Sequence, residues 1–261
     1  MTLKPFSIIS AITMAAAASL AGSTVTARAV EITFFCAGAL QTTAEELLPE
    51  FQKSTGHNVK VIYTSIGLIT QRVRNGELAD LAIVSPQQWE DLKNEGKLDP
   101  NVRVVIAKVG AGVFVKNGAA KPDISSVEAF KRALLNAKSI ALVDPAAGGP
   151  VALYAPGLFE RLGISAQVKP KRKLVGGGGA PVEPVISGDA EIGLTTISEI
   201  IQFQPAIELV GPLPPDIQAF FAYTAAIPKN AKEPTVAKAL LEFFTSPRAI
   251  SILKPKGLEP G

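Results

Sequence analysis

The chain has 261 residues, of which 47% are hydrophobic and 19% are charged, and its formal net charge is +3 at neutral pH. This composition is that of a globular protein, and so small a positive charge gives no electrostatic footprint for a nucleic acid. The single cysteine, Cys36, excludes an internal disulfide, and its apolar neighbours favour a buried core position.

Residues 1–29 are typical of a secretory signal peptide. Lys4 supplies the positive charge, an apolar stretch follows, and Ala27-Arg28-Ala29 resembles a cleavage site. An uncleaved membrane anchor is the alternative. No later stretch reaches the roughly 20 apolar residues that a membrane-spanning helix needs. We therefore expect a mature chain that begins at Val30 and is located in the periplasm.

The first half of the mature chain alternates predicted strands and helices. Thr43 and Glu46 have the spacing of a capping box, Gly56 is a helix stop, and Ser85-Pro86 is a typical helix start. We expect strands at residues 31–40, 58–65 and 79–86, and helices at residues 41–56, 66–76 and 87–96.

The second half repeats this order. Ser125 and Glu128 again have the spacing of a capping box, and Gly163 is typical of a helix end. We expect strands at residues 138–145, 167–175 and 190–196, and helices at residues 127–137, 149–163, 181–188, 234–247 and 247–254.

Two long extended stretches, residues 102–118 and 217–228, contain no crossover helix. Alternating strands and helices predict parallel sheets covered by helices on both faces. We therefore predict an α/β fold of two doubly wound lobes, joined by two extended crossover strands, with a ligand cleft between the lobes. The expected divisions are residues 30–107 with 220–261 for lobe 1, and residues 108–219 for lobe 2.

Motifs for catalysis or metal binding are absent from the sequence. The glycine run at residues 176–179 does not fit a dinucleotide-binding fingerprint, and neither a phosphate-binding loop nor a nucleophile elbow is present. His57, the only histidine, lies in a turn and is interpreted as a solvated residue. Asp144, Glu183, Asp189 and Glu191 lack metal-ligand spacing. We predict no catalytic residue, no metal ligand and no cofactor.

The predicted strand ends carry small residues and hydroxyl groups. In an open α/β sheet, ligands bind at the carboxyl ends of strands, where helix N-termini present main-chain amides that favour anions. The alternative is that the glycines only permit tight turns. The strand-end segments are residues 36–39, 64–67, 144–151, 176–180 and 194–198.

At these loops the sequence resembles the periplasmic molybdate-binding proteins, which are solute receptors of ABC importers with the type 2 periplasmic binding protein fold. The resemblance covers nearly the whole mature chain. It rests on the order and spacing of four segments: "ITFFCAGAL", "YTSIGLITQRVRNGELADLAIVSPQQWEDL", "ISGDAEIGLTT" and "AKALLEFFTSPRAISILKPKG".

The resemblance implies oxyanion contacts at Ala39, Ile66, Val151, Gly178 and Thr196. Two serines of the family are Ala39 and Ile66 here, and its tyrosine is Thr196. Each hydrogen bond lost to a charged ligand costs about 1.5–3 kcal/mol, so the molybdate assignment does not follow. The candidate ligand-binding residues are Gly38, Ala39, Thr64, Ser65, Ile66, Gly67, Gly149, Val151, Gly178, Thr195 and Thr196.

These observations predict a monomeric, non-catalytic solute receptor of an ABC importer. Its partners would be a small anionic ligand, an oxyanion or a small organic acid, and the permease subunits of the importer. A true molybdate- or tungstate-binding protein is one alternative. A secreted enzyme that uses the same cleft is the alternative from another class.

Overall fold

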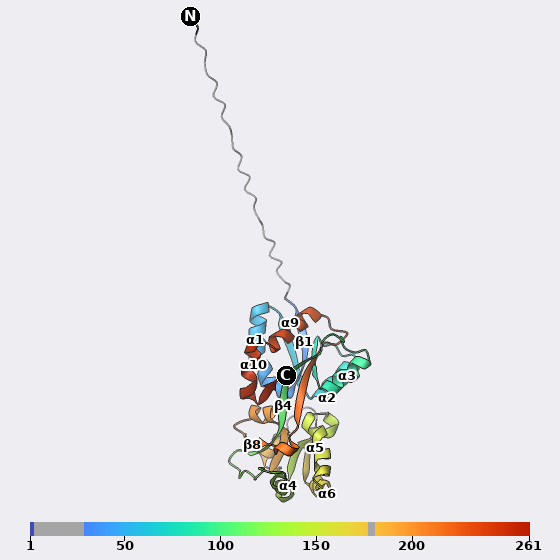
Figure 1. Cartoon of the computed structure of the whole chain (residues 1–261), viewed down its shortest axis with the longest axis vertical. Helices are drawn as coiled ribbons and strands as arrows, with labels where there is room; N and C mark the ends of the chain where they lie inside the picture. The colour runs from blue at the N-terminus through green and yellow to red at the C-terminus, as the bar shows by residue number, and fades with distance from the viewer. Residues whose placement is uncertain (3–28, 177–180) are drawn as a thin grey trace.

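The structure is a computed structural model that describes residues 1–2, 29–176 and 181–261 (Figure 1). It shows two α/β lobes that follow one another along the long axis of the molecule, with strands at the centre of each. The hydrogen-bonded strand order is β2-β1-β3-β9-β4-β7-β5-β6, and β10 and β8 also pair with β4.

The first lobe is built around three parallel strands, β1 (Glu31–Ala37), β2 (Asn58–Thr64) and β3 (Leu81–Val84), with β9 (Phe220–Ala226) antiparallel to β3. Successive side chains of β1 point to opposite faces of the sheet. Phe34 joins one buried cluster and Phe35 another, so both faces are covered. The helices of this lobe are α1 (Gln41–Thr55), α2 (Ile66–Arg74), α3 (Pro86–Asn94), α9 (Pro234–Phe244) and α10 (Pro247–Leu253).

The second lobe contains the parallel strands β5 (Ile140–Val143), β6 (Arg172–Val175) and β7 (Ile192–Thr196), together with β8 (Ile207–Pro212). Two buried clusters again cover two faces, one around Phe130 and one around Phe114. The helices are α4 (Val127–Asn136), α5 (Pro150–Arg161), α6 (Ser165–Val168), α7 (Glu183–Ser187) and α8 (Ile197–Gln202).

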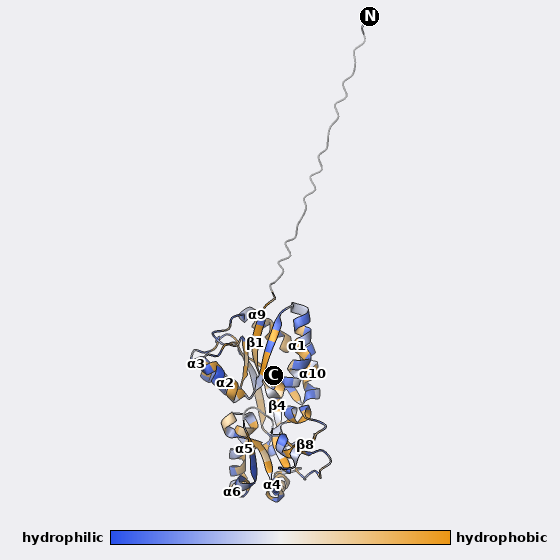
Figure 2. Ribbon diagram, turned by 180° about the vertical axis from the view of Figure 1, so that it is seen from behind, coloured by the Kyte–Doolittle hydropathy of each residue, from blue (hydrophilic) through white to orange (hydrophobic). Residues whose placement is uncertain are grey.

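Strand β4 (Val104–Lys116) belongs to both lobes. Its first half pairs with β9 and with β10 (Leu258–Pro260), and its second half pairs with β7 and β8. The hydropathy colours show apolar strands inside and mixed helices outside in both lobes (Figure 2). The predicted fold class is confirmed. The lobe boundaries, which fall within β4 and directly before β9, stay predictions.

Asp80 ties three elements of the first lobe together. Its side chain is 5% exposed, and its carboxylate accepts main-chain hydrogen bonds from Thr33 of β1 and from Lys232 and Glu233 before α9, at 2.8–2.9 Å. A buried charge requires such partners, because leaving it without them is costly. The Ala79-Asp80 pair of the motif therefore has a structural role.

Several local predictions were wrong. The first helix has Leu40 as its N-cap, and Thr43 is buried without a hydrogen bond to its hydroxyl. The capping box predicted at Ser125 is displaced by one residue, because Ser126 is the N-cap of α4. The strand predicted at residues 167–175 is shortened to β6, and helical turns precede it. Pro170 lacks the main-chain N–H that pairing with a neighbouring strand requires. Strand β8 and helix α8 were not predicted.

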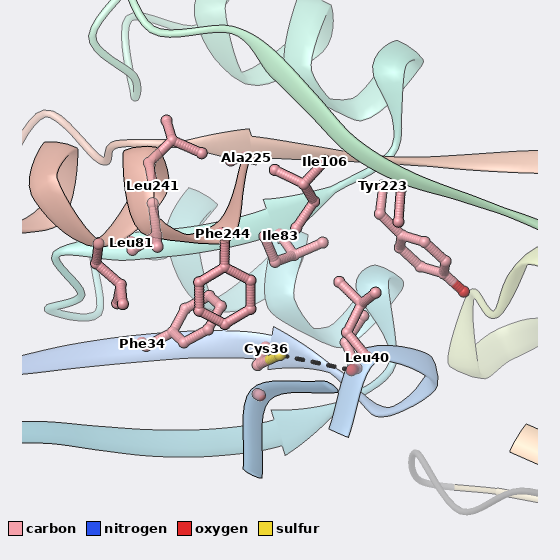
Figure 3. Packing of buried hydrophobic residues seen from close by; sticks show 14 of the residues in the cluster. Phe34, Cys36, Leu40, Leu81, Ile83, Ile106, Tyr223, Ala225, Leu241 and Phe244 are labelled. Atoms are coloured by element: carbon pink, nitrogen blue, oxygen red, sulfur yellow. Dashed lines mark hydrogen bonds between the residues drawn. The ribbon is translucent and has the colours of Figure 1, made fainter. Parts of the chain in front are cut away.

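Other local predictions are confirmed. Gly56 ends α1 in the left-handed conformation, with φ of 75°. Ser85 caps α3 in a full capping box with Gln88, and Pro86 is its first residue. Cys36 is buried beside Phe34 in the first core (Figure 3), as predicted, and burial raises the pKa of its thiol. Within the described ranges, no helix is long and apolar enough to cross a membrane.

Candidate functional site

A cavity lies between the lobes, at the carboxyl ends of β1, β2, β5 and β7. The first lobe contributes the end of β1, the junction of β2 with α2, and one side chain of β9 to the wall of this cavity. The second lobe contributes the end of β5, the start of α5, and the junction of β7 with α8. The lining residues are Ala37, Gly38, Ala39, Thr64, Ser65, Ile66, Val143, Gly149, Pro150, Val151, Ala152, Thr195, Thr196, Glu199 and Tyr223.

The structure brings most of the predicted ligand-binding residues together in this wall. They are Gly38, Ala39, Thr64, Ser65, Ile66, Gly149, Val151, Thr195 and Thr196. Gly67 is placed outside the wall. Gly178, and with it the proposed contact from the glycine run, lies outside the described residues. That these residues bind a ligand stays a prediction.

Ser65 connects the two lobes at the rim of the cavity. It is the N-cap of α2, where its hydroxyl oxygen accepts a hydrogen bond from the amide of Leu68 at 3.3 Å. The same hydroxyl donates to the carbonyl oxygen of Ala147 in the second lobe at 2.5 Å. One side chain therefore caps a helix and holds the lobes together.

Gly67 packs against Gly148 immediately beside this hydrogen bond. A Cβ atom placed on Gly67 would lie 2.6 Å from the Cα of Gly148 and 2.8 Å from the carbonyl oxygen of Ala147. Gly148 also has φ of 68°, a conformation that favours glycine. At this point the main chains of the two lobes are in direct contact.

The N-termini of α2 and α5 face the cavity from opposite lobes. Ser65 and Gly149 are the N-caps, and Ile66 and Val151 lie in the first turns, where amides have no partner within the helix. Such amides favour an anionic group. None of the lining residues in the described part of the chain is Lys, Arg or His.

Glu199 is a carboxylate in the wall that the sequence analysis missed. Its Oε2 atom accepts hydrogen bonds from the hydroxyl of Thr195 and from that of Thr196, the latter at 3.0 Å. Its Oε1 atom faces the other lobe, since a Cβ placed on Gly38 would lie 3.7 Å away from it. Burial raises the pKa of Glu199, while the hydrogen bonds from the two threonines act in the opposite direction.

A sequence signal for Glu199 was present. Thr196 and Glu199 have the spacing of a capping box, and Thr196 is the N-cap of α8. Because α8 has only six residues, its apolar pattern is too short to stand out. The sequence analysis therefore assigned no helix to this segment, and its carboxylate was overlooked.

Tyr223 is the second missed residue of the wall. It comes from β9, its side chain is 1% exposed, and its hydroxyl points away from the cluster of Phe34 and Phe244 (Figure 3). Burial raises the pKa of its phenol well above the ordinary value, and the nearby charge of Glu199 acts in the same direction. The phenol therefore remains neutral and can donate a hydrogen bond.

His57 is remote from the cavity. Its Nδ1 atom accepts a hydrogen bond from the amide of Val30 at 3.4 Å, directly before β1, and it does not line the cavity. No group of three or more His, Cys, Asp or Glu side chains that could hold a metal ion occurs among residues 29–176 and 181–261.

Comparison with known proteins adds three findings. The family model described as bacterial extracellular solute-binding protein matches residues 32–259. An aconitate isomerase from a Pseudomonas species is 29% identical over 238 residues, covering 88% of this chain and 87% of that protein. The molybdate-binding protein ModA of Azotobacter vinelandii is 23% identical over 235 residues, covering 88% of this chain and 90% of that protein.

A solved structure of the periplasmic molybdate-binding protein of Azotobacter vinelandii has the same fold. It superposes with a TM-score of 0.73 at 22% identity, and the match covers 88% of this chain and 99% of that chain. At this identity the likeness shows the fold alone. It confirms the predicted type 2 periplasmic binding protein architecture. The family match and the similarity to ModA, taken with it, confirm the predicted resemblance to the molybdate-binding proteins.

Proposed function

The chain belongs to the family of bacterial extracellular solute-binding proteins, and we propose that it binds a small organic acid in the cavity between its lobes. The observation that carries this proposal is the composition of the wall. Amides at the starts of two helices and several hydroxyls favour an anion, and Glu199 stands among them. A carboxyl group of the ligand can share one proton with the carboxyl group of Glu199, so that the two groups together carry one negative charge and not two.

An organic acid fits this wall better than molybdate does. Ala39 and Ile66 lack the hydroxyls that the resemblance to molybdate-binding proteins would require. The relative with 29% identity is named for an organic acid, aconitate, which points in the same direction.

The proposal extends to transport. After removal of residues 1–29, the protein would act in the periplasm as a monomer that passes its ligand to the permease subunits of an ABC importer. Closure of the lobes on the ligand would produce the surface that the permease recognises. The contacts of Ser65 and Gly67 with the second lobe support such a closed arrangement.

A thermal-shift panel on the mature chain, residues 30–261, tests the ligand class. A ligand present far above its dissociation constant raises the unfolding temperature, because it binds only the native state. We expect shifts with small di- and tricarboxylic acids and none with neutral sugars. A shift with molybdate, tungstate or sulfate alone would contradict the organic-acid assignment, and a shift with sugars alone would contradict the anion site.

A second candidate function is isomerisation of a bound unsaturated acid. Glu199 and the neutral phenol of Tyr223 line the same cavity, and this pairing of a carboxylate with a hydrogen-bond donor suits proton transfer. The similarity to the Pseudomonas aconitate isomerase favours the same reaction class. Turnover of trans-aconitate by the purified protein separates an isomerase from a receptor.

A further inference from the structure

We infer that Glu199 is the acid–base group of this cavity and moves a proton along the allylic system of a bound unsaturated tricarboxylic acid. The inference rests on the proposed binding of an organic acid at this site. It assigns to the protein a specific reaction, a 1,3-proton shift, and a specific residue that performs it.

The two oxygens of Glu199 have different surroundings. Oε2 is held by the hydroxyls of Thr195 and Thr196, so the side chain has a fixed position. Oε1 lies beside Gly38, 3.7 Å from the place that a Cβ atom on this glycine would take, and both residues line the cavity. A carboxylate held in place in the wall of the cavity has the geometry that a general base needs.

The surroundings of Glu199 also suit its protonation chemistry. The carboxyl lies in a wall that also contains apolar residues, among them Ala37 and Val143. Burial raises the pKa of this carboxyl above its ordinary value. A raised pKa makes the ionised form of Glu199 a stronger base.

Tyr223 supplies the complementary group. Removal of a proton beside a conjugated carboxylate places additional negative charge on the oxygens of that carboxylate. A neutral phenol in the same wall can donate a hydrogen bond to this charge, and a donor placed in advance is worth about 10²–10³ in rate. Tyr223 comes from the first lobe and Glu199 from the second, so both act on one ligand only when the lobes enclose it.

The proposed step is balanced and needs no co-reactant. Ionised Glu199 takes a proton from the CH2 carbon of a CH2–C=CH unit, so that one C–H bond breaks and one O–H bond forms. The electron pair moves into the conjugated system and the double bond shifts by one position. Glu199 then returns its proton to the far carbon of the unit, where a C–H bond forms. The carboxylate is regenerated, and the substrate is neither oxidised nor reduced.

In trans-aconitate this shift exchanges the positions of the CH2 group and the double bond, and the product can take either double-bond geometry. The experiment incubates the mature protein with trans-aconitate in D2O and follows proton NMR. We expect cis-aconitate to appear, with deuterium in its CH2 group to the extent that Glu199 exchanges the abstracted proton with solvent before it returns it. Glu199→Gln should slow both by at least a hundredfold, and Tyr223→Phe should slow both by at least tenfold.

Two controls keep the outcomes distinct. Glu160→Gln removes an exposed carboxylate of α5 outside the wall and should exchange at the wild-type rate. Calorimetry with trans-aconitate should show that Glu199→Gln still binds. Binding by the wild type with neither cis-aconitate formation nor deuterium exchange would overturn the proton-transfer inference and leave the receptor function intact. Undiminished exchange in Glu199→Gln would overturn the assignment of this residue, whereas failure to bind any organic acid would overturn the proposed function itself.

Discussion

Gly67 of the first lobe and Gly148 of the second lie so close together that neither has room for a Cβ atom. The hypothetical Cβ of either residue falls 2.6–2.7 Å from the Cα of the other. Since these are main-chain atoms, no side-chain rotation can relieve the overlap. The contact therefore requires glycine on both sides whenever the lobes adopt this arrangement.

Gly67→Ala is expected to disfavour the closed arrangement. We predict at least tenfold weaker ligand binding, about 1.4 kcal/mol, with little change in thermal stability without ligand. The matched control is Gly157→Ala in α5, where the nearest atom to an added Cβ is a flexible arginine terminus at 3.7 Å. Calorimetry on both variants measures the effect, and equal affinities would show that the contact at Gly67 does not govern closure.

Ser65→Ala removes two hydrogen bonds at once. Loss of the N-cap of α2 should lower the free energy of unfolding by about 1 kcal/mol. Loss of the bond to Ala147 should also weaken ligand binding severalfold. Ser126→Ala removes a comparable cap from α4, where no contact with the cavity exists, and should change only stability. Weakened binding in both variants would mean that capping alone explains the effect.

The pH dependence of stability should reveal Glu199. Burial raises its folded-state pKa above the ordinary value of 4.5, so the native chain binds this proton more tightly than the unfolded chain. The associated stability is fully present below pH 4.5 and is lost as the pH rises through the folded-state pKa. Relative to wild type, Glu199→Gln should therefore gain stability from pH 4.5 upward in urea titrations. A constant difference across the pH range would contradict the raised pKa.

The affinity for the ligand should depend on the protonation of Glu199 as well. Protonated Glu199 does not repel an anionic ligand, so affinity should fall as the pH rises through the pKa of this carboxyl. The hydroxyl of Thr196 lowers that pKa. Thr196→Val should therefore move the midpoint of the affinity–pH curve to higher pH. Calorimetry at several pH values, with an acid fully ionised throughout, tests this shift, and a movement to lower pH would disprove it.

Asp80→Ala is expected to destabilise the first lobe severely. The substitution leaves the amides of Thr33, Lys232 and Glu233 without their acceptor. Each buried donor left without a partner costs about 1–3 kcal/mol, so a loss of more than 3 kcal/mol in the free energy of unfolding is expected. Asp216→Ala, at an exposed position, should change it by less than about 0.5 kcal/mol. A small loss at Asp80 would show that water replaces the carboxylate.

The fold was predictable because its signals are local and repeated. Apolar runs such as that around Phe34 predicted buried strands, and Gly56 and Ser85-Pro86 marked helix ends that the structure confirms. The prediction failed at positions where long-range contacts prevail. Thr43 had the spacing of a cap, but Glu46 pairs instead with Arg248 and Lys256 near the chain's end.

The wall of the cavity was predictable where it consists of strand ends. The rule for open α/β sheets located Gly38, Ser65, Val151 and Thr196 without any structure. Tyr223 was not identified, because it lies within the extended stretch of residues 217–228 and not at one of the strand ends to which the rule was applied. Its place depends on β9 lying beside β3 and β4, a pairing between segments more than 100 residues apart. No local pattern contains that information.

Strand β9 and helix α9, near the end of the chain, complete the core that the first strand begins. Phe34 of β1 meets Phe244 of α9 with ring centroids 5.6 Å apart, and β9 is the neighbour of β3 in the sheet. A chain that is synthesised or exported from its N-terminus therefore presents β1 long before its packing partners exist. The second lobe, formed by one continuous segment, can collapse earlier. The order of folding should thus reverse the order of synthesis, with the N-terminal core closing last.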